Sequence, residues 1–378
     1  MTGAARTLYK LVSSVTRGVS EAEAAAGVAL FERTAGGLRA NAYGRTLLAR
    51  LARIEEEVTA ATADLARSGQ GSPTAPRHLL HDGRKLLLLL TLADTRAVSS
   101  AAAALGIGQA GASMALARIE AALGFRLFHR GLQGMTPTDP ASRLLLRARR
   151  IRAELRHAAS ELASAEGAVV GAAVIGTLPM ARADLLPRAI GTCLARAPGI
   201  QAQMVEAPAE ILVARLRSGE IDAVVTVPGP GFEPKGLVVE PLLRDEMAVL
   251  GCAGHPLASA GPLTLREVSA LRWILPWRSS MNRALFEARF IEEKLPPPRP
   301  AVQAADLSMI RGLLAASDMV AFISLRLFQF EIDAGLLAPL DLGRLSIERE
   351  VALVRREGAS LSLAAEALIA EIRGWGTG

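Results

Sequence analysis

The stretch SSAAAALGIGQAGASMALARIEAALG, residues 99–124, decides how the N-terminal half of the chain folds. Its centre GIGQAG (106–111) matches the glycine pattern of dinucleotide-binding loops, which follow a buried strand and open a helix. The residues ahead of it are alanine-rich, with none of the β-branched residues of a strand, and those behind it carry one apolar helical stripe. The members of this stripe are Ala112, Leu116, Ile119 and Leu123. The stretch therefore predicts two helices joined by a tight turn and disfavours a nucleotide-binding loop.

Length and composition indicate a folded protein of several domains. The 378 residues suffice for two or three domains, and a hydrophobic content of 51% is ample for their cores. The longest apolar run, LLLLLTLA (86–93), falls short of the roughly 20 residues that span a bilayer. The first residues do not form the basic and apolar blocks of a signal peptide, and two cysteines and five histidines show no metal-ligand spacing. We expect a cytoplasmic protein with no membrane segment, metal or other cofactor.

The positive charge of the chain is concentrated in its N-terminal part. Residues 1–166 contain 22 Lys and Arg against 14 Asp and Glu, whereas the remaining residues contain 21 against 23. A basic segment that carries a helix-turn-helix pattern favours a polyanionic partner such as double-stranded DNA. The alternative is a solvated basic face without a partner, since charge clusters alone are not specific.

The order of elements after residue 84 resembles a known family. The pattern predicts a helix, a short second helix, the turn, a third helix, a hairpin wing and a long helix from about residue 140 to 165. The run ARIEAALGFRLFHRGLQGMTPT (117–138) resembles the helix-turn-helix and wing of the LysR-type transcriptional regulators nearly residue for residue. The resemblance implies a winged helix-turn-helix domain over residues 81–139 and a linker or dimerisation helix over residues 140–166.

The third helix would lie in the major groove of DNA, with its polar face toward base edges and phosphates, while the wing would touch the backbone or minor groove. The candidates for DNA contact are Gln109, Ser113, Met114, Ala117 and Arg118 on the helix, and Arg130, Thr136 and Thr138 on the wing. The resembled family usually has Ser-Gln-Pro-Ala where this chain has GQAG (108–111), and often a basic residue in place of Met114. A lost capping hydroxyl costs about 0.5–2 kcal/mol. A regulator that has lost specific DNA binding is therefore a second hypothesis.

The sequence also contains an internal repeat. Residues 23–58 align without a gap on residues 120–155 at a constant offset of 97. Ahead of them, TRGVS (16–20) matches TRAVS (95–99) at an offset of 79. The difference predicts that the first copy is missing the counterpart of residues 100–117, which contain the second helix, the turn and the front of the third helix. The first copy is then not an intact DNA reader.

Both copies keep a long helix whose apolar residues alternate at spacings of four and three, as in a coiled-coil seam. The seam residues are Leu47, Leu51, Ile54, Val58, Ala61 and Leu65 in the first copy, and Leu144, Ala148, Ile151, Leu155, Ala158, Leu162 and Ala165 in the second. We assign residues 1–70 to a degenerate module with its coiled-coil helix and residues 71–80 to a linker. The resemblance implies that such a helix dimerises two chains. Here the two seams would pair within one chain or in a swapped dimer, unless the first copy is decayed and partly disordered.

Residues 167–378 alternate short apolar runs with amphipathic helices, which predicts an α/β domain with a parallel sheet. This domain resembles the effector-binding domain of the same regulators. The resemblance rests on GTLP (176–179), LRSGEIDAVV (216–225), GHPL (254–257) and LLAASDMVAFIS (313–324). It implies two subdomains around a cleft, as in periplasmic binding proteins, and is strongest to the subgroup that responds to sugars and aromatic acids.

Ligands of such sheets bind beyond the carboxyl ends of the strands, where helix N-termini favour anions. The candidates for ligand contact are Thr177, Leu178, Pro179, Glu206, Ala207, Thr226, Val227 and Ser308. Thr177 has the alternative role of an ordinary turn hydroxyl. Glu206 disfavours a dianion unless it points away or binds a sugar hydroxyl. We expect a small-molecule effector, either a sugar or a carboxylate.

Together these features predict a ligand-responsive, DNA-binding transcriptional regulator that forms homo-oligomers. The alternatives are a protein of the same build without specific DNA binding, and an enzyme or solute-binding protein on the same α/β frame. We expect no enzyme, because no nucleophile, base and orienting residue stand at a recognisable spacing.

Overall fold

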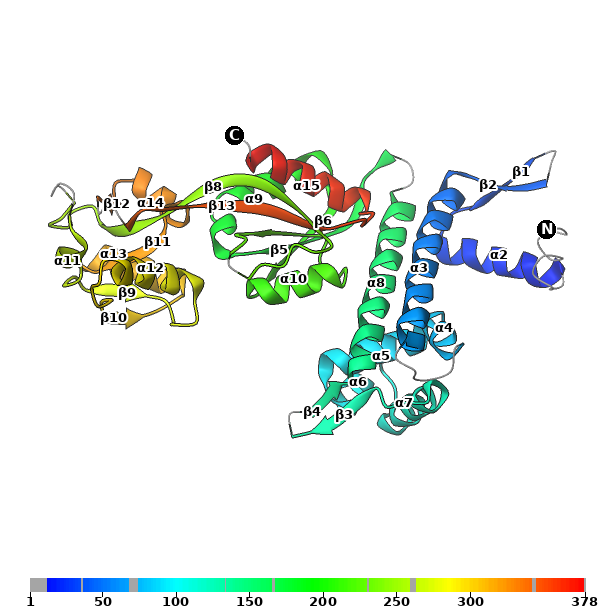
Figure 1. Cartoon of the computed structure of the whole chain (residues 1–378). Coiled ribbons are helices and arrows are strands. Elements are labelled where there is room, and N and C mark those ends of the chain that lie inside the picture. The colour runs from blue at the N-terminus through cyan, green and yellow to red at the C-terminus, as the bar shows by residue number, and fades with distance from the viewer. Residues whose placement is uncertain are drawn as a thin grey trace.

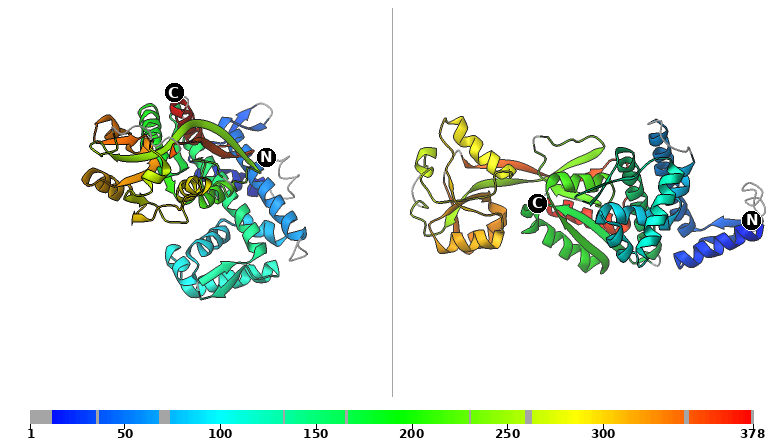
Figure 2. Two further views of the ribbon diagram at one scale, coloured as in Figure 1. Left: turned by 60° about the vertical axis from the view of Figure 1, so that its left-hand side comes forward. Right: turned by 90° about the horizontal axis from the view of Figure 1, so that it is seen from below.

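The structure is a computed structural model, and Figure 1 shows a helical N-terminal part beside two α/β lobes. The residues that it describes are 12–34, 37–67, 74–132, 134–164, 167–229, 231–258, 263–341 and 345–376. The predicted seam residue Ala165 and the first part of the predicted linker lie outside these ranges. Two long helices, α3 (Ala42–Arg67) and α8 (Asp139–Ala163), lie side by side in Figures 1 and 2 and connect the other parts.

The first module, residues 12–67, consists of α2 (Val12–Ala26), a hairpin of β1 (Phe31–Thr34) and β2 (Gly37–Ala40), and α3. Helix α2 and the hairpin project from the side of α3 that faces away from the lobes (Figure 2). The prediction that its third helix is truncated is wrong, because residues 16–20 lie inside α2, which has 15 residues like its counterpart in the second module. In this module, the described residues include no counterpart of the first and second helices.

The second module, residues 74–163, is a complete winged helix-turn-helix. Its elements are α4 (Ala75–Leu80), α5 (Gly83–Thr95), α6 (Val98–Ala104), α7 (Gln109–Leu123), β3 (Phe128–Gly131), β4 (Gly134–Pro137) and α8. Helix α4 occupies the second half of the predicted linker, and its Pro76, Leu79 and Leu80 are buried in the core of the module. The linker is therefore shorter than predicted, because these apolar side chains pack on the module.

Packing of α5 against the other helices forms the core of the second module. Asp82 caps α5 by accepting hydrogen bonds from the backbone N–H groups of Arg84 and Lys85. The leucines that follow, Leu86, Leu88, Leu89, Leu90 and Leu92, are buried with the predicted stripe of α7. Within the described ranges no single helix is long and apolar enough to cross a membrane. Helices α6 and α7 satisfy that test as a bent pair, but Ala101, Ala102 and the α7 stripe are buried in this core.

The C-terminal domain is built on one mixed sheet that joins nine of the described strands. Their order is β10-β9-β11-β8-β13-β7-β5-β6, with β12 also paired to β8. The predicted parallel sheet is parallel only in part, because the long strands β8 (Leu237–Cys252) and β13 (Ile347–Arg356) run antiparallel to each other through both lobes. The pairing of β8 with β13 has one register shift, between Val351 and Ala352.

Each lobe surrounds its end of β8 and β13 with parallel strands and helices. The first lobe contains β5 (Val170–Thr177), η2 (Pro179–Arg182), α9 (Leu185–Arg196), β6 (Gly199–Glu206), α10 (Ala209–Arg217), β7 (Ala223–Thr226) and α15 (Leu363–Gly376). The second lobe contains α11 (Leu265–Val268), β9 (Trp273–Leu275), α12 (Met281–Glu292), β10 (Pro300–Gln303), α13 (Leu307–Ala316), β11 (Val320–Ser324), η3 (Leu325–Phe328), α14 (Gln329–Asp333) and β12 (Leu337–Leu340). The strand ends of the two lobes therefore face each other across the β8–β13 crossing, as expected for a two-lobed binding domain.

Candidate DNA-binding surface and effector cleft

The turn between α6 and α7 fixes the angle at which α7 is presented. Gly106 has a φ of +64°, a conformation that side chains disfavour, and the backbone N–H of Ile107 donates to the carbonyl of Ala102 at 3.0 Å. The two helix axes meet at 110°, within the range of helix-turn-helix motifs. The glycine pattern therefore serves the bend between helices and not a phosphate-binding loop.

Most of the predicted DNA contacts lie on the surface of the second module. Gln109, Met114, Ala117 and Arg118 on α7 and Arg130 and Thr136 on the wing are exposed, and Ser113 is half-buried. Gly108 stands at the N-cap of α7, so the first turn has no side-chain cap. Thr138 differs from the others because it is buried, its hydroxyl donating to the Arg126 carbonyl at 3.0 Å and accepting from the Ala141 N–H at 3.3 Å. Thr138 thus caps α8 and has no surface to offer to DNA.

The wing is held against the helix-turn-helix by backbone contacts. The N–H of Met135 donates to the carbonyl of Arg96, in the α5–α6 turn, at 2.7 Å. Gly134 has a φ of +92°, and a Cβ atom there would lie 2.7 Å from the same carbonyl oxygen. The wing therefore depends on a glycine for its close approach, and it carries Arg130 and Thr136 in a fixed relation to α7.

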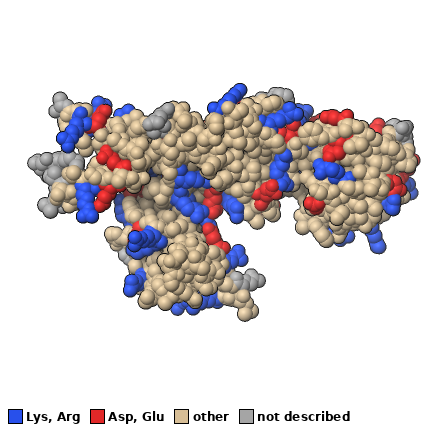
Figure 3. Space-filling model, turned by 180° about the vertical axis from the view of Figure 1, so that it is seen from behind, with Lys and Arg blue, Asp and Glu red and all other residues tan. Residues whose placement is uncertain are grey.

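Lys and Arg side chains lie at intervals around the projecting helical domain in Figure 3, mixed with Asp and Glu near the lobes. On α7 and the wing, Arg118 and Arg130 are both exposed, and no ion pair is assigned to either among the described residues. Their positive charge is available to phosphate groups, which favour free guanidinium donors.

A cleft of about 430 Å³ lies between the two lobes. Its apolar wall contains Leu178, Pro179, Met180, Val227, Ile274, Phe322 and Ile323, and its polar residues are Glu210, Ser279, Ser280, Asn282 and Arg349. This combination of a mainly apolar lining with a few polar groups is typical of small-molecule sites.

Arg349 of β13 is the cation at the base of the cleft. Its Nε donates to Oδ2 of Asp245 at 2.6 Å, and its Nη1 donates to the side-chain oxygen of Asn282 at 3.0 Å. The other carboxylate oxygen of Asp245 accepts from the hydroxyl of Ser324 at 2.6 Å. Because Asp245 is buried and Arg349 is 14% exposed, this network holds the guanidinium rigidly at the cleft surface.

The N-termini of two helices at the cleft differ in how they are capped. The first turn of α13 is capped by Asp306, whose Oδ1 accepts from the N–H of Met309 at 2.8 Å. Helix α12 begins after Ser280, which makes no side-chain capping bond to any described residue, and its first residues Met281 and Asn282 line the cleft. The free N–H groups of α12 and the guanidinium of Arg349 therefore form the part of the cleft that favours a negative ligand group.

The structure distributes the predicted ligand contacts over three environments. Leu178, Pro179 and Val227 line the cleft, and Ala207 packs in the core of the first lobe. Thr177 and Thr226 are buried at the strand ends, with the Thr177 hydroxyl donating to the Leu178 carbonyl and the Thr226 hydroxyl lacking a described partner. Glu206 and Ser308 are exposed and do not line the cleft.

Two of these positions have a clear physical reason for lying outside. Glu206 forms an ion pair with Arg182 and does not belong to the residues that line the cleft. Ser308 lies one residue beyond Leu307, and the direction of α13 turns Leu307 toward the cleft and Ser308 outward. The polar groups that the sequence did not predict, Arg349 and Asn282, come from β13 and α12, far apart in the chain. The described residues contain no cluster of His, Cys, Asp or Glu arranged to hold a metal ion.

Comparison with protein families assigns both parts of the chain. The family described as LysR substrate binding domain matches residues 166–376. The family described as bacterial regulatory helix-turn-helix protein, lysR family, matches residues 84–142.

Individual proteins agree with this assignment. The HTH-type transcriptional regulator GalR of Pseudomonas putida is 37% identical over 370 residues, covering 98% of this chain and 92% of the relative, so the match includes the first module. A full-length OxyR from Pseudomonas aeruginosa superposes with a TM-score of 0.56 at 22% identity, covering 76% of this chain and 93% of that one. CbnR, a LysR family transcriptional regulator, gives 0.55 at 16% identity, covering 79% and 100%. The two structures share the fold of this chain over the part that they cover.

Proposed function

Because this chain belongs to the LysR family of bacterial transcriptional regulators, we propose that α7 and the β3–β4 wing read its operator and that a small effector binds between the lobes. The carrying observation is the exposed polar face of α7, presented at 110° to α6 and backed by a rigid wing. Gln109 and Ser113 donate to or accept from base edges, and Arg118 and Arg130 pair with phosphate or guanine. We place the protein with its DNA in the cytoplasm and assign it no reaction.

We expect the first turn of α7 to contact DNA more weakly than the first turn of a helix with a side-chain cap. Gly108 provides no capping oxygen, and Met114 provides no charge toward phosphate. Specificity then depends on few side chains, chiefly Gln109 and Arg118. Their loss should remove most of the preference for the operator over random DNA, since a good base contact is worth about 1–3 kcal/mol.

The DNA proposal is tested by fluorescence anisotropy on the duplex upstream of the gene, against a scrambled duplex, over a salt series. We expect tighter binding to the native duplex, and loss of that preference with Gln109→Ala combined with Arg118→Ala. The matched control is Arg299→Ala, which removes an exposed cation in the second lobe. Equal, steeply salt-dependent binding to both duplexes would favour the alternative of a regulator without specific DNA binding.

The proposed effector is a small carboxylate with an apolar body. Its negative group would lie at the N-terminus of α12 beside Arg349, and its body would lie against Leu178, Val227 and Phe322. A sugar is a weaker candidate, because the wall opposite the polar groups is apolar and Glu206, the predicted hydroxyl acceptor, is paired with Arg182.

A thermal-shift series tests the effector proposal with benzoate as the probe and benzamide as its uncharged control. Benzoate should raise the unfolding temperature and benzamide should not, and Asn282→Ala should reduce the benzoate effect. A response to sugars and none to benzoate or other small carboxylates would overturn the assignment of the ligand class.

The structure also offers a route from the cleft to the DNA-binding module. Helix α10 begins at the cleft with Ala209 and Glu210, and Glu220 just beyond its end contacts Arg149 at 3.5 Å and Arg152 at 3.1 Å on α8. Arg149 in turn binds Asp94 at the end of α5 at 2.8 Å. A shift of the first lobe on closure would therefore move α8 and α5 together, a rigid-body route to altered DNA affinity.

A further inference from the structure

The two N-terminal modules repeat the same elements at a fixed distance along the chain. Helix α2 and helix α7 have equivalent bounds when 97 is added to each residue number, as do the strands of the two hairpins. The hairpin registers also correspond, from Phe31 opposite Ala40 and Phe128 opposite Pro137. The sequence repeat therefore extends to the backbone of both modules.

The same hydrogen bonds hold the corresponding loops. Oε1 of Glu23 accepts from the N–H of Leu30 at 2.9 Å, and Oε1 of Glu120 accepts from the N–H of Leu127 at 2.7 Å. At the start of the long helices the side chain differs but its role does not. Asn41 caps α3 by accepting from the N–H of Gly44 at 2.9 Å and donates to the Ala29 carbonyl at 2.7 Å, as the Thr138 hydroxyl does for its own counterparts.

The contact between α3 and α8 is symmetric in the same numbering. On one side Arg50 of α3 pairs with Glu154, at 2.8 Å, and with Glu161. On the other side Arg147 of α8 pairs with Glu57 at 2.9 Å and with Asp64 at 3.1 Å. Adding 97 to Arg50, Glu57 and Asp64 gives Arg147, Glu154 and Glu161.

An interface in which residue i contacts j while the copy of j contacts the copy of i is the mark of a two-fold, isologous dimer. Here both halves belong to one chain and the helices run antiparallel, because higher residues of α3 meet lower residues of α8. The buried residues Val58, Ala61 and Leu65 of α3 belong to the same apolar cluster as Leu144, Ala148 and Ile151 of α8. Burial lowers the pKa of the Arg147 guanidinium, but its bonds to Glu57 and Asp64 more than offset this and raise it.

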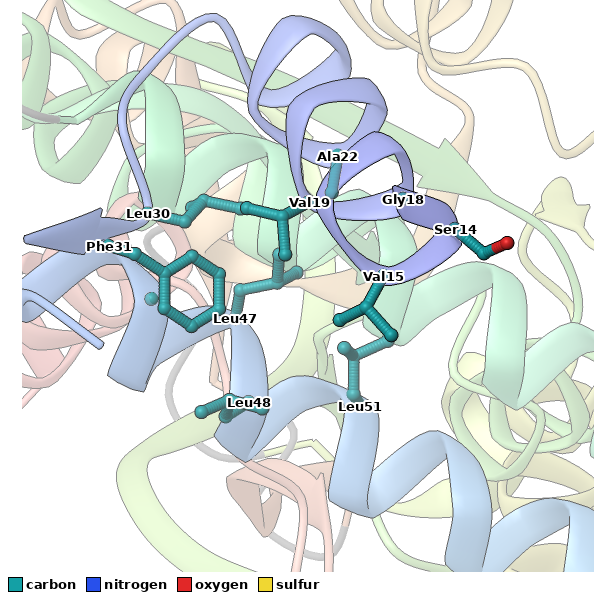
Figure 4. Close-up of a pocket in the computed structure, with 11 residues that line it drawn as sticks. Ser14, Val15, Gly18, Val19, Ala22, Leu30, Phe31, Leu47, Leu48 and Leu51 are labelled. Atoms are coloured by element: carbon teal, nitrogen blue, oxygen red, sulfur yellow. The ribbon is translucent and has the colours of Figure 1, made fainter. Parts of the chain in front are cut away.

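The two modules differ in the elements that cover their apolar faces. Figure 4 shows an open groove of about 290 Å³ between α2 and α3, lined by apolar residues such as Val19, Leu30, Leu47 and Leu51. Adding 97 to the number of each lining residue gives its counterpart in the second module. Most of these counterparts are buried in a core that α5 and α6 complete. The buried counterparts are Ala112, Leu116, Ile119, Leu127, Phe128, Ala141, Leu144, Leu145 and Ala148. Among the described residues nothing replaces α5 and α6 on the first module.

We propose that residues 12–67 are a second copy of the module and take the place of a second subunit. Helix α8 then pairs with helix α3 of its own chain and not with a long helix of another chain. One chain then contains a closed pseudo-dimer with one complete DNA reader. The pairing of the helices stands independently of DNA binding, and the statement that a single reader serves each chain rests on the function proposed above.

A zero-length cross-link tests the pairing on the full chain. The variant Arg147→Lys places an amine where a guanidinium now meets Glu57 and Asp64, and a carbodiimide joins amine and carboxylate within an ion pair. The native lysines are at positions 10, 85, 235 and 294, so the new cross-link is readily assigned by mass spectrometry. The native pair of Lys85 and Asp82, at 2.9 Å, serves as an internal control for the reagent.

We expect the cross-link from position 147 to Glu57 or Asp64 in a species that migrates as a single chain on a denaturing gel. The same cross-link in a species of two chains would show a swapped dimer and overturn the proposal. Its absence while the control link forms would overturn the pairing itself. Arg150→Lys, facing Glu57 across 3.4 Å in the native chain, repeats the test if the first variant fails to fold. Because no DNA is present, these outcomes are separate from those of the anisotropy assay.

Discussion

Replacing Arg50 with methionine should destabilise the helical part much more than the same change at Arg147, although the two residues occupy equivalent positions. Both guanidinium groups bind two carboxylates across the α3–α8 contact. Arg50 is 3% exposed, however, and donates in addition to the carbonyls of Ser360 and Leu361 in the first lobe. Arg147 is 22% exposed and has no lobe carbonyl among its assigned partners in the described chain.

The magnitude follows from what each change leaves behind. Without Arg50, the carboxylate of Glu154, 4% exposed, is buried without its main partner, and breaking such a pair costs about 3–5 kcal/mol. The partners of Arg147 are nearer the solvent, at 15% and 17% exposure, and water compensates them in part, so about 1 kcal/mol is expected. Burial lowers the pKa of Arg50, but its bonds to Glu161 and Glu154 raise it overall, so the group is charged at every accessible pH.

Urea denaturation followed by far-ultraviolet circular dichroism measures the difference, because helices dominate that signal. The Arg50→Met variant should unfold its helical part at markedly lower urea than Arg147→Met. Adding Glu154→Gln to Arg50→Met should recover part of the loss, since the buried charge is then removed. Equal midpoints for the two methionine variants would refute the reasoning that burial and the lobe carbonyls set the cost.

Three further outcomes are expected. Gly134→Ala should destabilise the second module by roughly 2–3 kcal/mol in thermal melting, because its Cβ would meet the Arg96 carbonyl. The control Gly37→Ala should cost about 1 kcal/mol, because Gly37 also has a positive φ but no described atom lies within 4 Å of the added Cβ. Burial lowers the pKa of His255 below its ordinary 6.5, so the unfolded chain binds the proton more readily than the folded chain. The free energy of unfolding should therefore fall as the pH drops from about 7.5 to 5.5, and it should fall less steeply in the His255→Gln variant. Glu220→Gln should leave the benzoate thermal shift unchanged while weakening the effect of benzoate on DNA affinity in anisotropy, because it loosens the bond to α8 and not the cleft.

The sequence predicted the second module well because its signals are local. The turn glycine and the stripe of α7 each depend on spacing within a short segment, and the structure places them as expected. The two seams were predicted less completely. Leu51 and Leu155 are 45% and 47% exposed, and Leu51 lines the open groove between α2 and α3.

The front of the first module was misassigned because a five-residue match outweighed a helical pattern. The similarity of residues 16–20 to residues 95–99 implied a deletion inside the third helix. The apolar spacing of α2, in Val15, Val19, Ala22 and Ala26, repeats the four-three-four spacing of the α7 stripe at the offset of 97. Periodicity over a whole helix constrains packing, whereas a short identity does not.

The cleft was the least predictable part because its polar groups meet only in three dimensions. The strand-end rule indicated Leu178, Pro179 and Val227, which line the cleft, but Arg349 lies within β13 and Asn282 within α12. They meet because β13 crosses from one lobe to the other, so the middle of that strand, and not its end, lies at the base of the cleft. A sequence rule based on the ends of parallel strands cannot identify a residue on an antiparallel crossing strand.

The retention of the first module has a physical explanation that does not involve reading DNA. Helix α8 pairs with α3 through Arg147, Glu154 and Glu161, and Arg50 joins this contact to the first lobe through the Ser360 and Leu361 carbonyls. The buried guanidinium of Arg50 in the first module therefore contacts both helix α8 of the second module and the first lobe of the effector domain. Whether or not the first module reads DNA, we expect the effector domain to need α3 and its ion pairs in order to hold α8 in a defined position.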